Sequence, residues 1–338
     1  MRKAARLLLL TAGLALFAWF VHRAGVGEIW RACANLGWLA PLALLPYAVI
    51  YASDTLGWRF AFAAGMPLPV SFWRLYLIRW CGESVNNVVP SAYIGGESVK
   101  VYLLHKRGVP AGQAAASAIV GRTLQLLTQV LFIALGAAAF VSIADPASGV
   151  RRAMVFVLAA SVGVVAALFW LQSHGMFSTL FRVLSKLRIR AAALESKREK
   201  LEQIDRRVVD FYRGDRKRFA LSACGYLCGW LLDTMDIFLA SWLLGMPIDW
   251  TQALAVEAFI SVAKMLGIFV PGALGVQESG IVLVCRLAGL PDALGLAYAI
   301  IRRGRDVVYA SIGWLLLYLE EATLKGLQER VASESNEP

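Results

Sequence analysis

Long apolar runs, broken by single charged positions, dominate the sequence. Mostly apolar stretches cover residues 7–21, 38–64, 114–143, 153–171, 219–244 and 294–319, and most are long enough to cross a bilayer as a helix. Two further stretches, at 70–104 and 253–290, are each divided by a segment rich in proline and glycine. The pattern predicts an all-α polytopic membrane protein with roughly seven full spans plus two hairpins.

The first dividing segment places Pro90, Gly95 and Gly96 directly before Glu97. Proline removes a backbone donor, and a carboxylate in hydrocarbon is unfavourable unless it faces a partner or water. Non-helical backbone at membrane depth is tolerated only where protein or a water-filled cavity covers it. We therefore expect a re-entrant broken helix near 71–104, beside a binding cavity.

The second dividing segment repeats this pattern with Pro271, Gly272, Gly275 and Glu278. Its proline and glutamate lie 181 residues after those of the first, at 271 against 90 and at 278 against 97. Further matches in the same order, with a drift of up to two residues, pair Ala118–Arg122 with Ala299–Arg303, Gly65–Pro67 with Gly245–Pro247, and Asp54–Thr55 with Asp233–Thr234. The sequence therefore predicts an internal duplication.

Charge predicts the topology of this duplication. The net charge is +11, and the basic residues cluster in loops and flanks, which favours contact with anionic lipid over nucleic acid. Three basic residues precede the first span, and a basic segment lies at 182–218. Both are expected on the cytoplasmic side, which requires that the stretch at 70–104 does not cross the membrane completely. The two repeats are then inverted, an architecture typical of alternating-access transporters.

The predicted organisation has five parts, and both termini are cytoplasmic. These are an N-terminal anchor helix at 1–37, a first repeat at 38–143 with a re-entrant hairpin near 71–104, a linking span and basic amphipathic segment at 144–218, a second repeat at 219–320 with a hairpin near 253–290, and a tail at 321–338.

Four charged residues are the main candidates for substrate binding and transport. Glu97 and Glu278 each stand at the start of a returning half-helix, where the helix dipole favours a carboxylate. We expect them to pair with Arg122 and Arg303, or to exchange protons or a cationic group during transport; the alternative is a structural helix cap. Arg122 and Arg303 are natural anchors for an anionic head group, and for Arg303 the alternative is internal pairing with Asp306.

Several other polar residues lie within the apolar stretches. Lys264 needs a partner from another helix or a substrate phosphate, because no carboxylate lies within a turn of it. Asn86, Asn87 and Gln277 flank the two breaks and are further binding candidates. Asp54, Asp233 and Asp236 are expected to stabilise helix packing or to pair with Arg59 and its neighbours.

Motifs for soluble enzyme chemistry do not occur. The three histidines lack metal-ligand spacing, and the sequence has no glycine-rich phosphate loop and no nucleophile elbow. We expect neither a metal nor a cofactor.

With both motifs in view, the chain resembles the flippase-like membrane domain of the lysylphosphatidylglycerol synthase (multiple peptide resistance factor) family and its stand-alone relatives. Val89 to Glu97, with Lys100 following, and Pro271 to Glu278 carry the resemblance, and Arg302 to Val308 look similar to the hopanoid-biosynthesis-associated subgroup. The resemblance implies a bacterial inner-membrane protein that moves a lipid. In the synthases a soluble aminoacyl-transferase domain follows the membrane part, whereas this sequence ends at Pro338, so we expect a transporter and not an enzyme.

The expected function is transport of a polar-headed lipid, which could be a phospholipid, an aminoacyl-phospholipid, a hopanoid or a polyprenyl-linked lipid. Two alternatives stay open. One is an enzyme or membrane subunit that acts in hopanoid, isoprenoid or glycolipid synthesis. The other is a scaffold that recruits cytoplasmic enzymes through the basic helix near 194–211. Candidate partners are membrane lipids, a cytoplasmic lipid-synthesis enzyme and a second copy of the chain.

Overall fold

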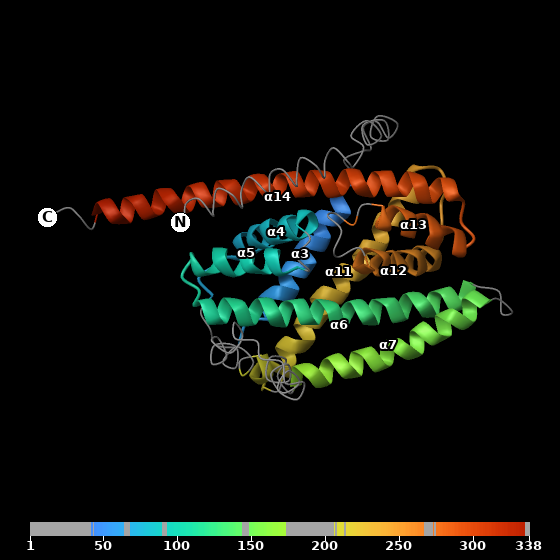
Figure 1. The fold of residues 1–338 in the computed structure, drawn as a ribbon, viewed down its shortest axis with the longest axis horizontal. Helices are drawn as coiled ribbons and strands as arrows, with labels where there is room; N and C mark the ends of the chain where they lie inside the picture. The colour runs from blue at the N-terminus through green and yellow to red at the C-terminus, as the bar shows by residue number, and fades with distance from the viewer. Residues whose placement is uncertain are drawn as a thin grey trace, which may run out of the picture.

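The computed structural model describes residues 42–334, except 43, 64–67, 90–92, 144–148, 174–205, 207, 213, 267–272 and 274. These residues form helices joined by turns and contain no strand (Figure 1). The helices are α3 (Leu45–Phe60), α4 (Phe72–Val88), α5 (Ile94–His105), α6 (Ala111–Ile143), α7 (Gly149–Ser173), α11 (Arg216–Leu243), α12 (Trp250–Leu266), α13 (Val276–Leu287) and α14 (Asp292–Glu334). The predicted anchor helix at 1–37, most of the basic segment at 182–218, and Pro90, Pro271 and Gly272 lie outside the described residues.

The apolar stretches of the sequence correspond closely to these helices. Among the described helices, α6 and α11 are long and apolar enough to cross a membrane by length and composition alone. The full span count stays a prediction. One difference is α14, which continues to Glu334 beyond the predicted end near residue 319. The extension, residues 320–334, contains strong helix formers and no proline.

Two helical hairpins dominate the architecture. The first hairpin is α4 with α5, the second hairpin is α12 with α13, and in each the two helices pack side by side. The first helices of the two hairpins are both 17 residues long, and the second helices are both 12 residues long. Each second helix starts from a residue with positive φ, Tyr93 at 67° and Gly275 at 79°. The two breaks seen in the sequence therefore fall between the two helices of each hairpin.

Cross-packing joins the two halves of the chain. α4 of the first hairpin packs against α14, and α12 of the second hairpin packs against α6. α3 packs against α11 along much of their lengths, and α7 covers the outer side of α6. In Figure 1, α14 runs along one side of the molecule and α6 with α7 along the other, with the hairpins between them. The described helices of the two halves thus pack into one body.

The first hairpin is held by an unusually close approach of its two helices. A Cβ atom at Gly96 would collide with the carbonyl oxygen of Gly82 and with the side chain of Asn86. The Asn86 Oδ1 accepts a hydrogen bond of 2.8 Å from the Gly96 backbone N–H. Gly96 and Gly95, predicted as break residues, lie in the first turn of α5. The absence of a side chain at Gly96 therefore allows α4 and α5 to touch, and the Asn86 hydrogen bond stabilises this contact.

Candidate functional site

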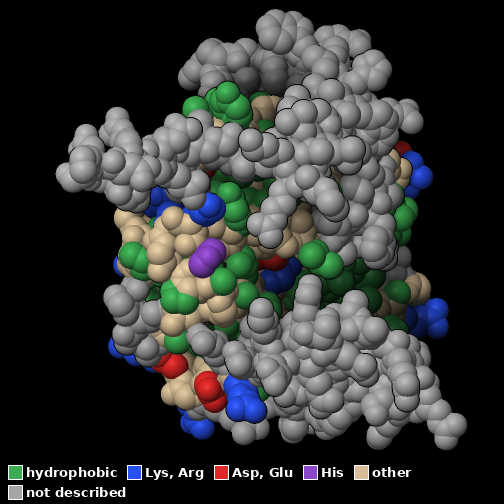
Figure 2. All heavy atoms as spheres, turned by 60° about the vertical axis from the view of Figure 1, so that its left-hand side comes forward, with side chains coloured by type: hydrophobic (Ala, Val, Ile, Leu, Met, Phe, Trp, Pro, Cys, Tyr) green, Lys and Arg blue, Asp and Glu red, His purple; other side chains and the backbone are tan. Residues whose placement is uncertain are grey.

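A cavity of about 1010 Å³ lies between the first hairpin and α6 on one side and α3, α11 and α12 on the other. We call it the central cavity. Figure 2 shows a hollow in which acidic and basic side chains are visible between hydrophobic ones. Its volume matches the upper end of ligand-binding pockets. The charged side chains on its wall are Asp54, Arg79, Glu83, Glu97, Arg122, Asp233, Lys264 and Arg302.

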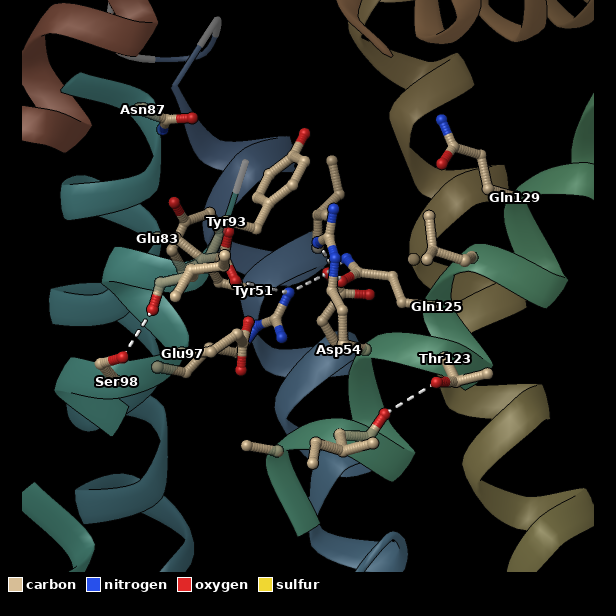
Figure 3. Close-up of a pocket in the computed structure, with 18 of the residues that line it drawn as sticks. Tyr51, Asp54, Glu83, Asn87, Tyr93, Glu97, Ser98, Thr123, Gln125 and Gln129 are labelled. Carbon is tan, nitrogen blue, oxygen red and sulfur yellow. Dashed lines mark hydrogen bonds and ion pairs between the residues drawn. The ribbon is translucent and has the colours of Figure 1, made fainter. Parts of the chain in front are cut away.

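Asp54 on α3, Glu83 on α4 and Glu97 on α5 line the cavity (Figure 3), and two cations alternate with these carboxylates. Arg79 Nη2 lies 2.5 Å from Asp54 Oδ2 and 3.8 Å from Glu83 Oε1. Lys100 Nζ lies 2.7 Å from Glu83 Oε1 and 2.8 Å from Glu97 Oε1. Arg79 and Lys100 are both only 3% exposed, so these carboxylates are needed to compensate for burying their positive charges. Glu97 is therefore the outermost member of a buried ionic network.

Arg122 on α6 has a different environment from the predicted one. Its guanidinium carbon lies 3.5 Å from the centre of the Tyr93 ring, and its Nη1 donates a hydrogen bond of 3.0 Å to Gln125 Oε1. No described carboxylate forms an ion pair with it. The predicted pair of Arg122 with Glu97 is therefore wrong, because Lys100, three residues after Glu97 on the same helix, occupies that carboxylate.

Lys264 on α12 is the second cation of the cavity wall without an ion pair to a described carboxylate. It lies within electrostatic range of Tyr47 and Asp306, yet no hydrogen bond joins it to a described residue. Asn87 on α4 lines the same cavity. The structure thus brings together four predicted residues: Glu97, Arg122, Lys264 and Asn87.

A second buried cluster lies where α12 meets α14. Arg302 Nη1 donates hydrogen bonds to Glu257 Oε1 at 2.6 Å and to the Tyr298 hydroxyl at 2.8 Å, and this hydroxyl also donates to Glu257 Oε2 at 3.0 Å. Glu257 is 1% exposed and Arg302 is 4% exposed. The carboxylate partner of Arg302 is therefore Glu257. The cluster fixes one edge of the central cavity.

Arg305 forms the neighbouring cluster one turn further along α14. It forms ion pairs with Asp236 on α11 and, at 3.0 Å, with Asp306. Its guanidinium carbon also lies 3.8 Å from the centre of the Tyr47 ring. The expectation that Asp236 supports helix packing is confirmed, since this pair joins α11 to α14.

Glu278 and Arg303 form the predicted ion pair, with Arg303 Nε donating 2.7 Å to Glu278 Oε1. The other carboxylate oxygen, Oε2, accepts a hydrogen bond of 2.8 Å from the Gly275 backbone N–H, so the helix-cap alternative is also realised. Neither residue lines the central cavity, and Gln277 and Asn86 do not line it either. Asn86, Glu278 and Arg303 therefore hold the hairpins in place outside the cavity, and Gln277 is buried at 3% exposure.

Four charged residues of the site were not predicted from the sequence: Arg79, Glu83, Lys100 and Glu257. Part of the signal was present, because Arg79 with Glu83 and Glu97 with Lys100 have helical neighbour spacing. Glu257 gave no such signal, since its partner lies 45 residues away on another helix.

Apolar helices packed around a cavity with charged walls are typical of a helical membrane domain. The family described as the lysylphosphatidylglycerol synthase TM region matches residues 4–313, and the chain belongs to this family. Among proteins with curated descriptions and among solved structures, none is significantly similar to it. Membership agrees with the resemblance carried by the two motifs, while the hopanoid-associated subgroup stays a prediction.

Proposed function

We propose that this protein is a lipid transporter that moves a polar-headed lipid across the bacterial inner membrane. The observation that carries the proposal is the central cavity, in which Arg122 and Lys264 have no carboxylate partner among the described residues. A family of lipid-related membrane domains supports it. The cavity offers groups that would bind a lipid head group, which supports transport.

The cavity wall suits a lipid that keeps its tails in the bilayer. A guanidinium can hold a phosphate through two parallel hydrogen bonds, and an ammonium adds a second positive charge, so Arg122 and Lys264 would hold the head group. Ile94 and Met265 also line the cavity and are 71% and 52% exposed. Acyl chains would follow this apolar edge outward while the head group stays inside.

Alternation between two sides would use the two halves of the chain. The matching hairpin lengths and the reciprocal packing of α4 on α14 and α12 on α6 support inverted repeats. In this proposal both termini are cytoplasmic, the first hairpin enters from the cytoplasm, and the second enters from outside. The Glu278 and Arg303 pair would keep the second hairpin closed while the first hairpin borders the open cavity.

The test is lipid translocation in proteoliposomes with tail-labelled lipids. Replacing Arg122 with Ala removes charge-assisted hydrogen bonds worth about 1.5–3 kcal/mol, so we expect transport to fall about tenfold or more. The matched control is Arg286→Ala, because Arg286 is exposed and pairs with Asp292 outside the cavity. Absence of translocation by the intact protein, or unchanged transport by a folded Arg122→Ala variant, would overturn the proposal. Chemical conversion of the lipid, detected by mass spectrometry, would favour an enzyme instead.

Glu278→Gln separates a direct role from a structural one. Because Glu278 caps α13 and pairs with Arg303 away from the cavity, we expect lower transport together with lower thermal stability. Lost transport at unchanged stability would instead give Glu278 the proton- or cation-exchanging role.

A further inference from the structure

Tyr93 has a backbone conformation that is unfavourable for a residue of its size. It directly precedes α5, and its φ is 67°. Left-handed backbone suits glycine and strains a bulky residue. The second hairpin has glycine at the equivalent place, since the residue that precedes α13 is Gly275, with a φ of 79°. The turn itself therefore does not need a tyrosine, and strain of this kind points to a role of the side chain.

The ring of Tyr93 contacts the cation that the proposed function uses most. Tyr93 lines the central cavity (Figure 3), and the guanidinium carbon of Arg122 on α6 lies over its ring, 3.5 Å from the ring centre. An aromatic face attracts a guanidinium and stacks on it. Stacking covers a face of the guanidinium but leaves its edge, where the N–H groups point, open to an acceptor. The ring thus holds Arg122 without using its hydrogen-bond donors.

A chain of hydrogen bonds holds the same guanidinium in a second way. Arg122 Nη1 donates to Gln125 Oε1 at 3.0 Å, and Gln125 Nε2 donates to Asp54 Oδ2 at 3.3 Å. Asp54 is itself fixed by the ion pair with Arg79 at 2.5 Å. The ring limits tilting of the guanidinium, and the hydrogen bond limits rotation in its plane. A group that is fixed in advance loses less conformational entropy when a ligand binds.

The stack also joins two elements of the fold. Tyr93 belongs to the first hairpin, because its carbonyl oxygen accepts a hydrogen bond of 3.2 Å from the Glu97 backbone N–H in the first turn of α5. Arg122 lies outside the hairpin on α6. A movement that carries α5 away from α6 takes the ring off Arg122. A ligand that needs the oriented guanidinium then binds one position of the hairpin more tightly, and such a difference in affinity is what shifts a conformational equilibrium.

We propose that Tyr93 is a positioning residue, which orients Arg122 for an anionic head group and links the binding of that group to the position of the first hairpin. The proposal rests on the proposed transport function and adds a residue to its mechanism. With the ring in place, the edge of the guanidinium faces the ligand. Without the ring, Arg122 keeps its charge but loses its fixed orientation.

The first experiment measures binding of short-chain phosphatidic acid, whose head group is a phosphate alone, by native mass spectrometry in detergent. Tyr93→Asn removes the ring and keeps a residue that tolerates left-handed backbone, so we expect affinity to fall about fivefold. Tyr93→Gly should show the same loss without backbone strain, and Tyr93→Phe should keep most of the affinity. The control is Tyr318→Asn, since Tyr318 is 72% exposed and does not line the cavity. Unchanged affinity of folded Tyr93→Gly, or an equal loss in Tyr93→Phe, would overturn the proposal.

The second experiment tests whether Tyr93 acts through Arg122. Tyr93→Asn is combined with Arg122→Ala, and the affinity for phosphatidic acid is measured for both single variants and for the double variant. We expect the double variant to bind as weakly as Arg122→Ala alone, because the ring then has no guanidinium to orient. A further fivefold loss in the double variant would show that Tyr93 acts independently of Arg122, and would refute the positioning role.

The third experiment tests the link to the hairpin by hydrogen exchange at residues 94–100. Saturating phosphatidic acid should slow exchange there in the intact protein and in Tyr93→Phe, but not in Arg122→Ala. Exchange that is unchanged in the intact protein would refute the link. If these effects are seen but the protein moves no lipid in proteoliposomes, the role of Tyr93 stands and the transport proposal fails. If lipid moves equally well in the intact protein and in Tyr93→Asn, transport stands and the role of Tyr93 fails.

Discussion

Glu257→Gln should destabilise the fold strongly, because it leaves the Arg302 guanidinium buried without its counter-ion. The side chains of Arg302 and Glu257 are 3% and 1% exposed, and their nitrogen and oxygen atoms lie 2.6 Å apart. Removing one partner of such a pair costs about 3–5 kcal/mol. The amide oxygen of glutamine keeps a hydrogen bond worth about 1 kcal/mol, so we expect the free energy of unfolding to fall by about 2–4 kcal/mol.

The assay is reversible unfolding in detergent micelles, titrated with sodium dodecyl sulfate and followed by the circular dichroism of the helices. The double variant Glu257→Gln with Arg302→Met removes both charges and should recover most of the loss. Asp292→Asn, in the exposed pair with Arg286, should leave the unfolding curve unchanged. A loss below about 1 kcal/mol for Glu257→Gln, or a double variant less stable than the single one, would refute this reasoning.

Two further predictions concern helix contacts. Glu320 of α14 is 5% exposed and forms ion pairs with Arg74, at 2.7 Å, and with Arg107. Glu320→Gln should therefore lower the free energy of unfolding by about 1–3 kcal/mol in the same titration. An unchanged unfolding curve would contradict a role of Glu320 in fixing the first hairpin. Gly136→Val should cost about 1–3 kcal/mol, because a Cβ atom at Gly136 of α6 would collide with Ala258 of α12, while Gly163→Ala in open space on α7 should not destabilise. Equal effects of the two glycine substitutions would show that this close packing is unimportant.

The order and extent of the helices were largely readable from the sequence. Apolar run length predicted where most described helices lie, and the two proline and glycine segments predicted the positions of both reversals. These signals are local, since a break in a helix depends on the residues at the break. The continuation of α14 to Glu334 was not predicted, because the loss of apolar character near residue 319 ends the membrane-spanning pattern but does not end the helix.

The partners of the charged residues were much harder to predict. Glu278 pairs with Arg303 as the repeat suggested, but Glu97, at the matching position, pairs with Lys100 instead of Arg122. Ion pairing between helices depends on how each helix is rotated about its axis, and a repeat in sequence does not fix that rotation. Helical neighbour spacing could have found the Lys100 pair, whereas only the structure shows that Tyr93 covers Arg122.

The close contact between Gly82 and Gly96 has a consequence for how the cavity can change shape. Together with the Asn86 hydrogen bond and the Lys100 bridge to Glu83, it ties residues 82–86 of α4 to residues 96–100 of α5. Relative sliding of the two helices would break all of these contacts at once. A change in the cavity that preserves these contacts would have to move α4 and α5 together as one unit.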